Sequence, residues 1–242
     1  KVIACEGGEI DIDASAEKGK YNIAGIVIHA DDDVKLIAAK GGEIDIEAEA
    51  QKGKINIAGV VLCAGDDVEM YASKGGEIDI EGEAQKGKNN MALVKVNADD
   101  DVKMEAEKGG EIDIEAEAEK GKINKAKVAI NAGDDVEITA FKGGEVSIEA
   151  EAQHGDKNKA KVDIEAGDDA ELAAFMGGEI DVKANAEDDD EKNIATVNIT
   201  AGDDVKILAF KGGEIDVKAI AEKGKFNIAG VLVGAGDDVK MI

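Results

Sequence analysis

A phrase of about 34 residues recurs along the whole chain, and this repetition constrains the fold more than any other feature. Each copy is marked by a Gly-Gly pair before Glu, at Gly7, Gly41, Gly75, Gly109, Gly143, Gly177 and Gly212. The spacing is 34 residues five times and 35 residues once. Constant spacing of this kind is typical of a repeat architecture, in which each copy packs only against its neighbours. We therefore expect a single repeat domain over residues 1–242.

The one extra residue lies in the segment AEDDDEKN, between Ala186 and Asn193, where other copies carry QKGK or EKGK. Loops tolerate insertions better than the strands or helices that they connect. We therefore predict a loop at this point of every copy.

Each copy alternates apolar and polar residues with a period of two, which predicts β-strands. In EIDIEAEA, one face carries Ile44, Ile46, Ala48 and Ala50, and the other carries only Glu and Asp. The segment INIAGVVLCA carries Ile55 and Ile57, and after its Ala-Gly step Val60, Leu62 and Ala64 form the inward set. A third run, DDVEMYA, carries Val68, Met70 and Ala72, and Gly-Gly, Lys-Gly-Lys and Gly-Asp-Asp separate the runs as turns. Each copy is thus three or four short strands.

Comparison of the copies position by position supports this assignment. One position is Ala in every copy, at Ala30, Ala64, Ala98, Ala132, Ala166, Ala201 and Ala235. The apolar position two residues earlier is Ile, Leu or Val, whereas the position between them varies freely from His29 and Cys63 to Glu165. Inward and outward positions of stacked strands should differ in this way.

Two architectures could use such repeats. In a parallel β-solenoid (a right-handed β-helix) each copy is one coil, whereas in a closed ring, such as a seven-bladed propeller or a barrel, each copy is an antiparallel unit. Propeller blades need two apolar faces, and the acidic face of EIDIEAEA therefore favours the solenoid. Copies one, two and seven share the sequences NIAGIVI, NIAGVVL and NIAGVLV, which would be neighbours only in a ring. The ring therefore stays open as the alternative.

The composition narrows the possible partners. The net charge is −26, so phosphate backbones and anionic membrane surfaces would be repelled, and no nucleic-acid binding is expected. No apolar run is long enough to insert into a membrane. Cations, basic partners or further copies of the chain remain possible. There is no Pro, Trp or Arg and aromatic residues are 2%, so the core must be built from Ala, Ile and Val and must be narrow.

The acidic turns are the strongest candidate site. Two neighbouring columns of Asp would stack in a solenoid, namely Asp32, Asp66, Asp100, Asp134, Asp168, Asp203 and Asp237, and Asp33, Asp67, Asp101, Asp135, Asp169, Asp204 and Asp238. Carboxylates and turn carbonyls are ligands for Ca²⁺, which would relieve repulsion between like charges about 5 Å apart. This predicts weak, multi-site Ca²⁺ binding. The competing interpretation is a solvated acidic surface with lysines nearby.

No residue pattern indicates catalysis or a required cofactor. His29 and His154 have no Ser, Cys or second His at a matching position, so both are interpreted as surface residues. Cys5 and Cys63 fall at different positions of the repeat, which argues against a disulfide between them. We therefore expect a protein that is not an enzyme.

The segment of each copy that corresponds to INIAGVVLCA varies most on its outward side. Lys125, Lys127, Lys159 and Lys161 occupy it in the middle copies, whereas Val27, Val61 and Leu232 occupy it in the first, second and last copies. Exposed apolar residues can mark association surfaces, so self-association or end-to-end stacking of copies is possible.

The combination of INIAGVVLCAGDDVEM with GGEIDIEA resembles the haemagglutinin-type repeats of bacterial filamentous haemagglutinin-like exoproteins. That resemblance implies a right-handed parallel β-helix, secretion to the cell surface or beyond, and an adhesive role. The repeats of that family are shorter and rich in Thr, Ser and Asn, whereas this chain carries Glu, Asp and Lys.

These observations favour a rigid, acidic structural or adhesive segment of a secreted or surface protein. One alternative is a designed or consensus-built repeat scaffold, which the missing Arg, Pro and Trp would fit. The other is a Ca²⁺-dependent binding module with a ligand at the irregular copies five and six.

Overall fold

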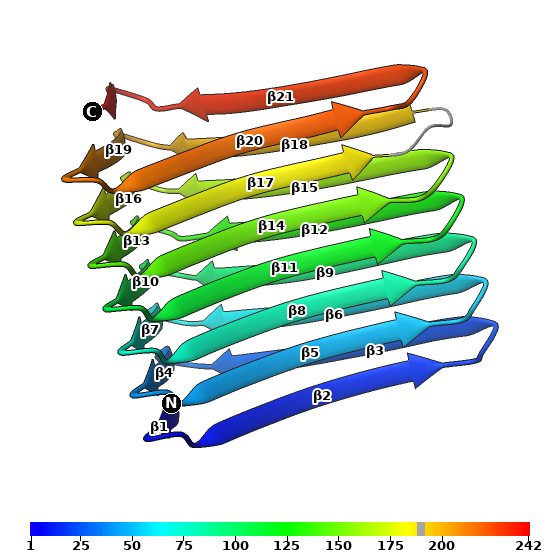
Figure 1. Cartoon of the computed structure of the whole chain (residues 1–242), viewed down its shortest axis with the longest axis horizontal. Coiled ribbons are helices and arrows are strands. Elements are labelled where there is room, and N and C mark those ends of the chain that lie inside the picture. The colour runs from blue at the N-terminus through cyan, green and yellow to red at the C-terminus, as the bar shows by residue number, and fades with distance from the viewer. Residues whose placement is uncertain (188–191) are drawn as a thin grey trace.

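The chain folds into a parallel β-solenoid with three strands in each coil (Figure 1). The computed structural model describes residues 1–187 and 192–242. Sheet A contains β1 (Val2–Cys5), β4 (Val34–Ala39), β7 (Val68–Ser73), β10 (Val102–Glu107), β13 (Val136–Phe141), β16 (Ala170–Phe175), β19 (Val205–Phe210) and β22 (Val239–Met241). Sheet B contains β2 (Glu9–Glu17), β5 (Glu43–Gln51), β8 (Glu77–Gln85), β11 (Glu111–Glu119), β14 (Glu145–Gln153), β17 (Glu179–Glu187) and β20 (Glu214–Glu222). Sheet C contains β3 (Tyr21–Ala30), β6 (Ile55–Ala64), β9 (Asn89–Ala98), β12 (Ile123–Asn131), β15 (Lys157–Ala166), β18 (Lys192–Ala201) and β21 (Phe226–Gly234).

All strand pairing among the described residues is parallel, and each strand pairs with its counterpart one repeat away. Ile44 of β5 lies beside Ile78 of β8, and Ala64 of β6 lies beside Ala98 of β9. The solenoid is confirmed, and the closed antiparallel ring is wrong because β3 and β21 lie at opposite edges of sheet C. The likeness of copies one, two and seven therefore does not reflect contact between them.

The predicted loop of the sixth copy falls on residues 188–191, which lie outside the described residues. The strands on either side show what the extra residue changes. Sheet C pairs β15 with β18 at a separation of 35 residues, and sheet B continues in register from β17 to β20. The insertion is therefore absorbed without a shift of register.

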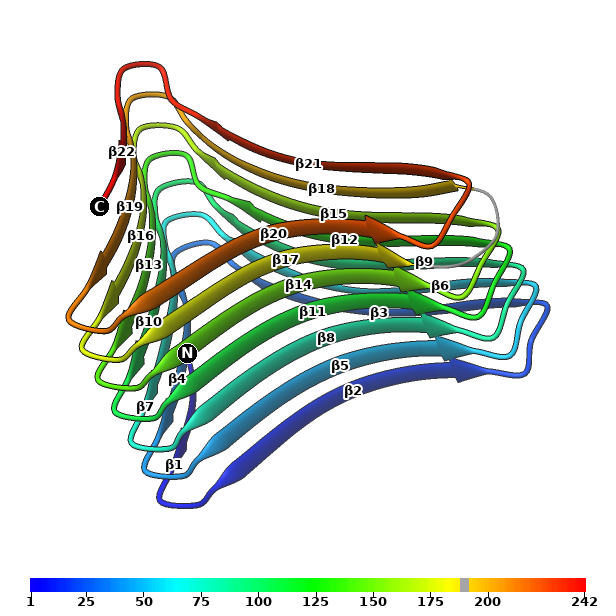
Figure 2. The same cartoon turned by 45° about the horizontal axis from the view of Figure 1, so that its top comes forward.

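The cross-section of each coil is a wedge. Sheets B and C converge from the short sheet A toward a narrow edge, as Figure 2 shows. Along β5, the buried Ile44 and Ile46 lie toward the wide end and Ala48 and Ala50 toward the narrow edge. Side-chain volume thus falls as the gap narrows, as close packing requires. This geometry explains a core that is almost free of aromatic residues.

The predicted inward columns are confirmed, with one difference. Leu62 and Met70 are at most 1% exposed, and the Ala64 column lines the interior. The alternation does not change phase at the Ala-Gly step, because β6 alternates without a break. Ile55 and Ile57 therefore face outward, and Asn56 faces inward.

The inward Asn side chains form a ladder along the narrow edge. Asn56, which is 0% exposed, donates from Nδ2 to the carbonyl oxygen of Gln85 and to Oδ1 of Asn90 at 3.1 Å. The same pair of hydrogen bonds recurs from coil to coil, starting from Asn22, Asn90, Asn124 and Asn158. A buried amide is costly unless it is hydrogen-bonded, so each Asn depends on its counterpart in the next coil.

The Gly-Gly pair performs two separate tasks at the corner between sheets A and B. Gly41 has a φ of 72°, a conformation that glycine adopts with little cost. Gly42 faces the previous coil so closely that a Cβ atom would lie 2.4 Å from the Ala4 carbonyl. The first glycine is thus required by its backbone angle and the second by lack of space.

The seven coils form a block that is about as broad as it is long. Neighbouring strands lie about 4.8 Å apart, so seven coils extend roughly 30–35 Å along the solenoid axis, and a ten-residue strand such as β6 spans about 33 Å. The longest axis of the molecule follows the strands of sheets B and C (Figure 1).

The Asn ladder gives a stability prediction. Replacing Asn90 by Ala removes two donated hydrogen bonds and leaves the carbonyl of Glu119 and Oδ1 of Asn124 without this donor. We expect Asn90→Ala to lower the free energy of unfolding by about 2–4 kcal/mol, measured by urea denaturation. The neighbouring Asn89 is exposed, and Asn89→Ala should change it by less than about 0.5 kcal/mol. Equal effects of the two substitutions would contradict the ladder.

Candidate cation-binding site

Both Asp columns lie at the corner between sheets C and A, in the turn that links, for example, β6 to β7. The structure stacks them coil upon coil as predicted, so like side chains are neighbours along the axis. Pairing on either side of the turn places Ala64 beside Ala98 and Val68 beside Val102. The stacked arrangement of the columns is therefore confirmed, and binding of a cation would require carboxylate oxygens that are not already hydrogen-bonded.

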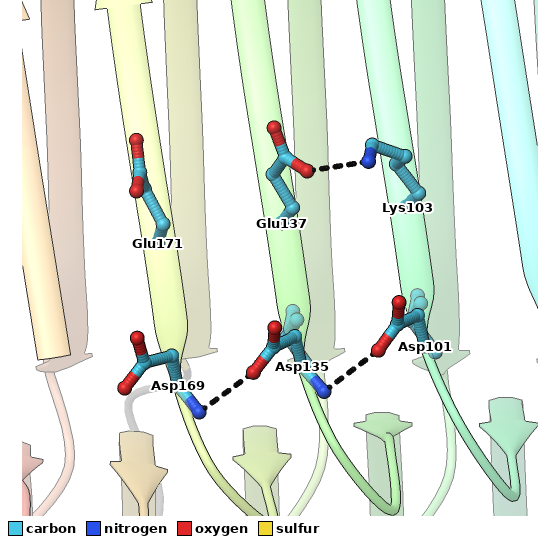
Figure 3. A pocket seen from close by; sticks show the side chains of 8 residues that line it. Asp101, Lys103, Asp135, Glu137, Asp169 and Glu171 are labelled. Atoms are coloured by element: carbon cyan, nitrogen blue, oxygen red, sulfur yellow. Dashed lines mark hydrogen bonds and ion pairs between the residues drawn. The ribbon is translucent and has the colours of Figure 1, made fainter. Parts of the chain in front are cut away.

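In the second column the carboxylates bind the backbone of the following coil. The Asp135 N–H donates to Oδ1 of Asp101 at 3.0 Å, and the Asp169 N–H donates to Oδ1 of Asp135 at 2.9 Å (Figure 3). The same bond joins Asp101 to Asp67, Asp204 to Asp169, and Asp238 to Asp204. One oxygen of each accepting carboxylate is thus already used to link two coils.

In the first column the backbone forms the links and the side chains remain outside. The Asp134 N–H donates to the carbonyl oxygen of Asp100 at 2.9 Å. Partial desolvation, followed by the charges of Asp134 and Asp66, raises the pKa of Asp100. The charge of Asp168 raises the pKa of Asp203, followed by partial desolvation and the charge of Asp237. These carboxylates repel one another, which is the property that suggested a cation.

Lysine side chains neutralise part of the negative charge at this corner by forming ion pairs. Figure 3 shows a shallow depression beside the second column, lined by Asp101, Asp135 and Asp169 and by Lys103, Glu137 and Glu171. Lys103 Nζ lies 2.7 Å from Oε2 of Glu137. Further along the solenoid, on β19, Lys206 Nζ lies 2.9 Å from Oδ2 of Asp169, and this hydrogen bond holds the pKa of Asp169 below its ordinary value.

A Ca²⁺ ion takes six to eight oxygen ligands. Within residues 1–187 and 192–242, no group of three or more His, Cys, Asp or Glu side chains is arranged to hold a metal ion. Each coil supplies only two or three Asp to the corner, and one oxygen of most second-column carboxylates accepts a backbone N–H. Binding of Ca²⁺ at these columns therefore stays a prediction.

A second acidic surface lies on the outer face of sheet B. We call it the carboxylate face, made of Asp45, Glu47, Glu49, Asp79, Glu81, Glu83, Asp113, Glu115 and Glu117 on β5, β8 and β11. In-register pairing places Glu81 beside Glu115 and Asp79 beside Asp113. The acidic face of these strands is evident from the alternation in the sequence, whereas the strong change in its titration depends on burial in the folded sheet.

Burial and mutual repulsion keep protons on this face. Burial, followed by the charges of Glu149 and Glu81, raises the pKa of Glu115 to about 8. Burial, followed by the charges of neighbouring carboxylates, also raises the pKa values of Asp79 and Glu81 to about 7. These side chains are less than half exposed because identical neighbours flank them on both sides. The face can therefore take up protons near neutral pH.

The column that contains Glu81 and Glu115 changes sign further along the solenoid. Glu149 lies beside Lys183, and the two form an ion pair. Lys218 follows in the same column on β20. In this column, carboxylates flanked only by other carboxylates are therefore confined to β2, β5, β8 and β11.

The remaining candidate residues lie apart from both surfaces. Cys5 and Cys63 are free thiols, as expected. The side chains of His29 and His154 are each 62% exposed, next to Asp31 at 3.6 Å and Glu119 at 3.7 Å respectively. Both histidines are thus surface residues, as predicted.

Comparison with known proteins does not add to this picture. No family model matches the chain, and no curated protein or solved structure is similar to it at a significant level. The resemblance to haemagglutinin-type repeats therefore stays a prediction. The described residues include no helix that could cross a membrane.

The raised pKa values predict an unusual dependence of stability on pH. A carboxylate with a raised pKa in the folded state binds its proton more tightly when the chain is folded, so its protonation stabilises the fold. The stabilisation is fully present below the ordinary pKa of about 4 and is lost as the pH rises through about 7 to 8. The melting temperature, followed by circular dichroism, should therefore rise as the pH is lowered from about 8 to about 5.

A substitution assigns this effect to the carboxylate face. Glu115→Gln removes the charge while keeping the shape, and should raise the free energy of unfolding at pH 8 by about 1–2 kcal/mol after allowance for solvent screening. It should also flatten the pH dependence. Glu43→Gln, at the exposed start of β5, is the matched control and should retain that dependence. A melting temperature that falls steadily below pH 8 in the unaltered protein would refute this account.

Proposed function

We propose that the chain is a non-catalytic structural segment, a rigid acidic scaffold within a secreted or surface protein. The observation that carries the proposal is the unbroken register of three sheets through every coil. Because each coil contacts mainly its two neighbours, such an array is extended by adding coils without redesign of the core. The polar groups that lie between coils, the Asn ladder and the second Asp column, join one coil to the next.

The resemblance to haemagglutinin-type repeats supports placement at the cell surface or outside the cell, and an adhesive role. The acidic surface fits this placement as well, because strong net charge keeps an exposed protein soluble and limits nonspecific association. A designed or consensus-built scaffold would have the same physical properties, so this alternative concerns origin rather than structure.

Binding of a ligand in a Ca²⁺-dependent manner is the competing function. The scaffold and the binding module differ in their local stability, because ligand-binding regions are drawn from the less stable parts of a fold. In a scaffold, copies five and six should be as well protected as copies three and four. In a binding module they should open more readily and should be ordered by Ca²⁺.

Amide hydrogen exchange of the whole chain, with and without millimolar Ca²⁺, tests the proposal. We expect slow exchange that is uniform from β6 to β18, with faster exchange only in the first and last coils, whose strands are more exposed. Mg²⁺ at equal concentration is the control and should give the same result as Ca²⁺. Fast exchange confined to copies five and six, suppressed by Ca²⁺ but not by Mg²⁺, would favour the binding module.

A further inference from the structure

The outer face of sheet C carries positive charge in a protein whose net charge is −26. We call its central part the lysine face, made of Lys95, Lys125, Lys127, Lys159 and Lys161 on β9, β12 and β15. Pairing of β12 with β15 places Lys125 beside Lys159 and Lys127 beside Lys161. Four of these ammonium groups therefore form a small grid of two columns and two coils.

One buried acid holds half of this grid in place. Asp163, which is 2% exposed, lies 2.9 Å from Nζ of Lys127 and 2.7 Å from Nζ of Lys161, and Asn198 donates to its other oxygen at 2.8 Å. Burial acts to raise the pKa of Asp163, but the two ammonium groups and Asn198 outweigh it and hold the pKa below its ordinary value. One carboxylate shared by two lysines leaves a net positive charge at the surface.

The other half of the grid has no such partner. Lys125 and Lys159 are exposed, and neither forms an ion pair with any residue in 1–187 or 192–242. Both border a shallow groove whose floor includes Met91 and Leu93. Their aliphatic stems can lie on this apolar floor while the ammonium groups remain available to an anion.

The carboxylate face, in contrast, carries an excess of negative charge. Its acids stand in three columns on β5, β8 and β11, and burial and repulsion among them raise the pKa values of Asp79, Glu81 and Glu115. In these coils no lysine stands in the three columns, because Lys183 enters only on β17. A row of ammonium groups laid across this face would replace repulsion by attraction.

The two faces share the same dimensions. Both are built from parallel strands in register, so charges recur about 4.8 Å apart between strands and about 6.6 Å apart between alternate residues of a strand. Sheets B and C enclose the core between them, so their outer faces point away from each other (Figure 2). The lysine face of one molecule can therefore meet the carboxylate face of another without obstruction from its own.

We propose that the lysine face of one copy binds the carboxylate face of a second copy, so that solenoids associate side by side with their strands aligned. Because the two surfaces in contact differ, the second copy still offers a free lysine face, and the association is open-ended rather than a closed dimer. Electrostatic complementarity of this kind is weakened by salt. This inference does not depend on the scaffold function and would hold for a binding module as well.

Sedimentation velocity of the whole chain, across a range of protein concentrations at low and high ionic strength, tests the proposal. We expect association at low ionic strength that salt reverses. The double variant Lys125→Gln, Lys159→Gln should weaken it about tenfold or more. The matched control Lys54→Gln, Lys88→Gln removes the same charge from exposed turn residues outside both faces and should associate like the unaltered chain.

A charge exchange identifies the two surfaces directly. A chain with Lys125→Glu and Lys159→Glu should not self-associate, nor should a chain with Glu81→Lys and Glu115→Lys. An equimolar mixture of the two should associate, because each lysine face then meets a carboxylate face. Circular dichroism of each variant establishes that it is folded before the mixture is made.

Three results would overturn the proposal. One is an unaltered chain that stays monomeric at low salt and at high concentration. Another is association that persists in the Lys125→Gln, Lys159→Gln variant, which would assign the contact to the ends of the solenoid. The third is tight binding of heparin by the lysine face in a chain that does not self-associate, which would assign that face to a foreign polyanion.

Discussion

Every strand residue of this protein lies beside its own counterpart from the neighbouring coil, and the rest of the structure depends on this in-register stacking. A parallel solenoid converts each position of the repeat into a column of like side chains about 4.8 Å apart. Each side chain therefore lies next to the side chains at the same position of the repeat in the adjacent coils. Apolar columns such as Ile46 and Ile80 gain from this, since buried apolar surface is added with every coil.

A polar column stabilises or destabilises the fold according to whether its side chains can hydrogen-bond to one another. An amide both donates and accepts, so Asn56 can form hydrogen bonds inside the core, one of them to Asn90 of the next coil. The Asp101 column solves the problem through the backbone N–H of the next coil. Ionised Glu side chains cannot hydrogen-bond to one another and repel, so burial together with the charges of Glu149 and Glu81 raises the pKa of Glu115. On sheet A the same conflict is removed where Lys and Glu follow each other, as in Lys103 and Glu137.

The repeat and its alternation were enough to predict the sheets, the corners and most of the inward columns. They did not reveal the role of Asn56, because a polar residue between Ile55 and Ile57 looks like an outward position. The same position is Asn in every copy, from Asn22 to Asn227, and this invariance is the feature of the sequence that could have indicated an inward side chain. The Asp columns were found, but their hydrogen bonds to the next coil depend on turn geometry that the sequence does not specify. The raised pKa of Glu115 depends on burial, which the sequence does not specify either.

Proximity of equivalent residues in adjacent coils is the central claim, and thiol bridging tests it most directly. Cys63 pairs with Asn97, whose Nδ2 lies 3.6 Å from its Sγ. In a Cys5→Ser chain, Asn97→Cys places a second thiol one coil from Cys63, whereas Asn131→Cys places it two coils away. A bifunctional bromobimane, which fluoresces when it bridges two thiols about one strand spacing apart, should react within the Asn97→Cys chain and not within the Asn131→Cys chain. Equal fluorescence from both chains, or from neither, would contradict the stacking.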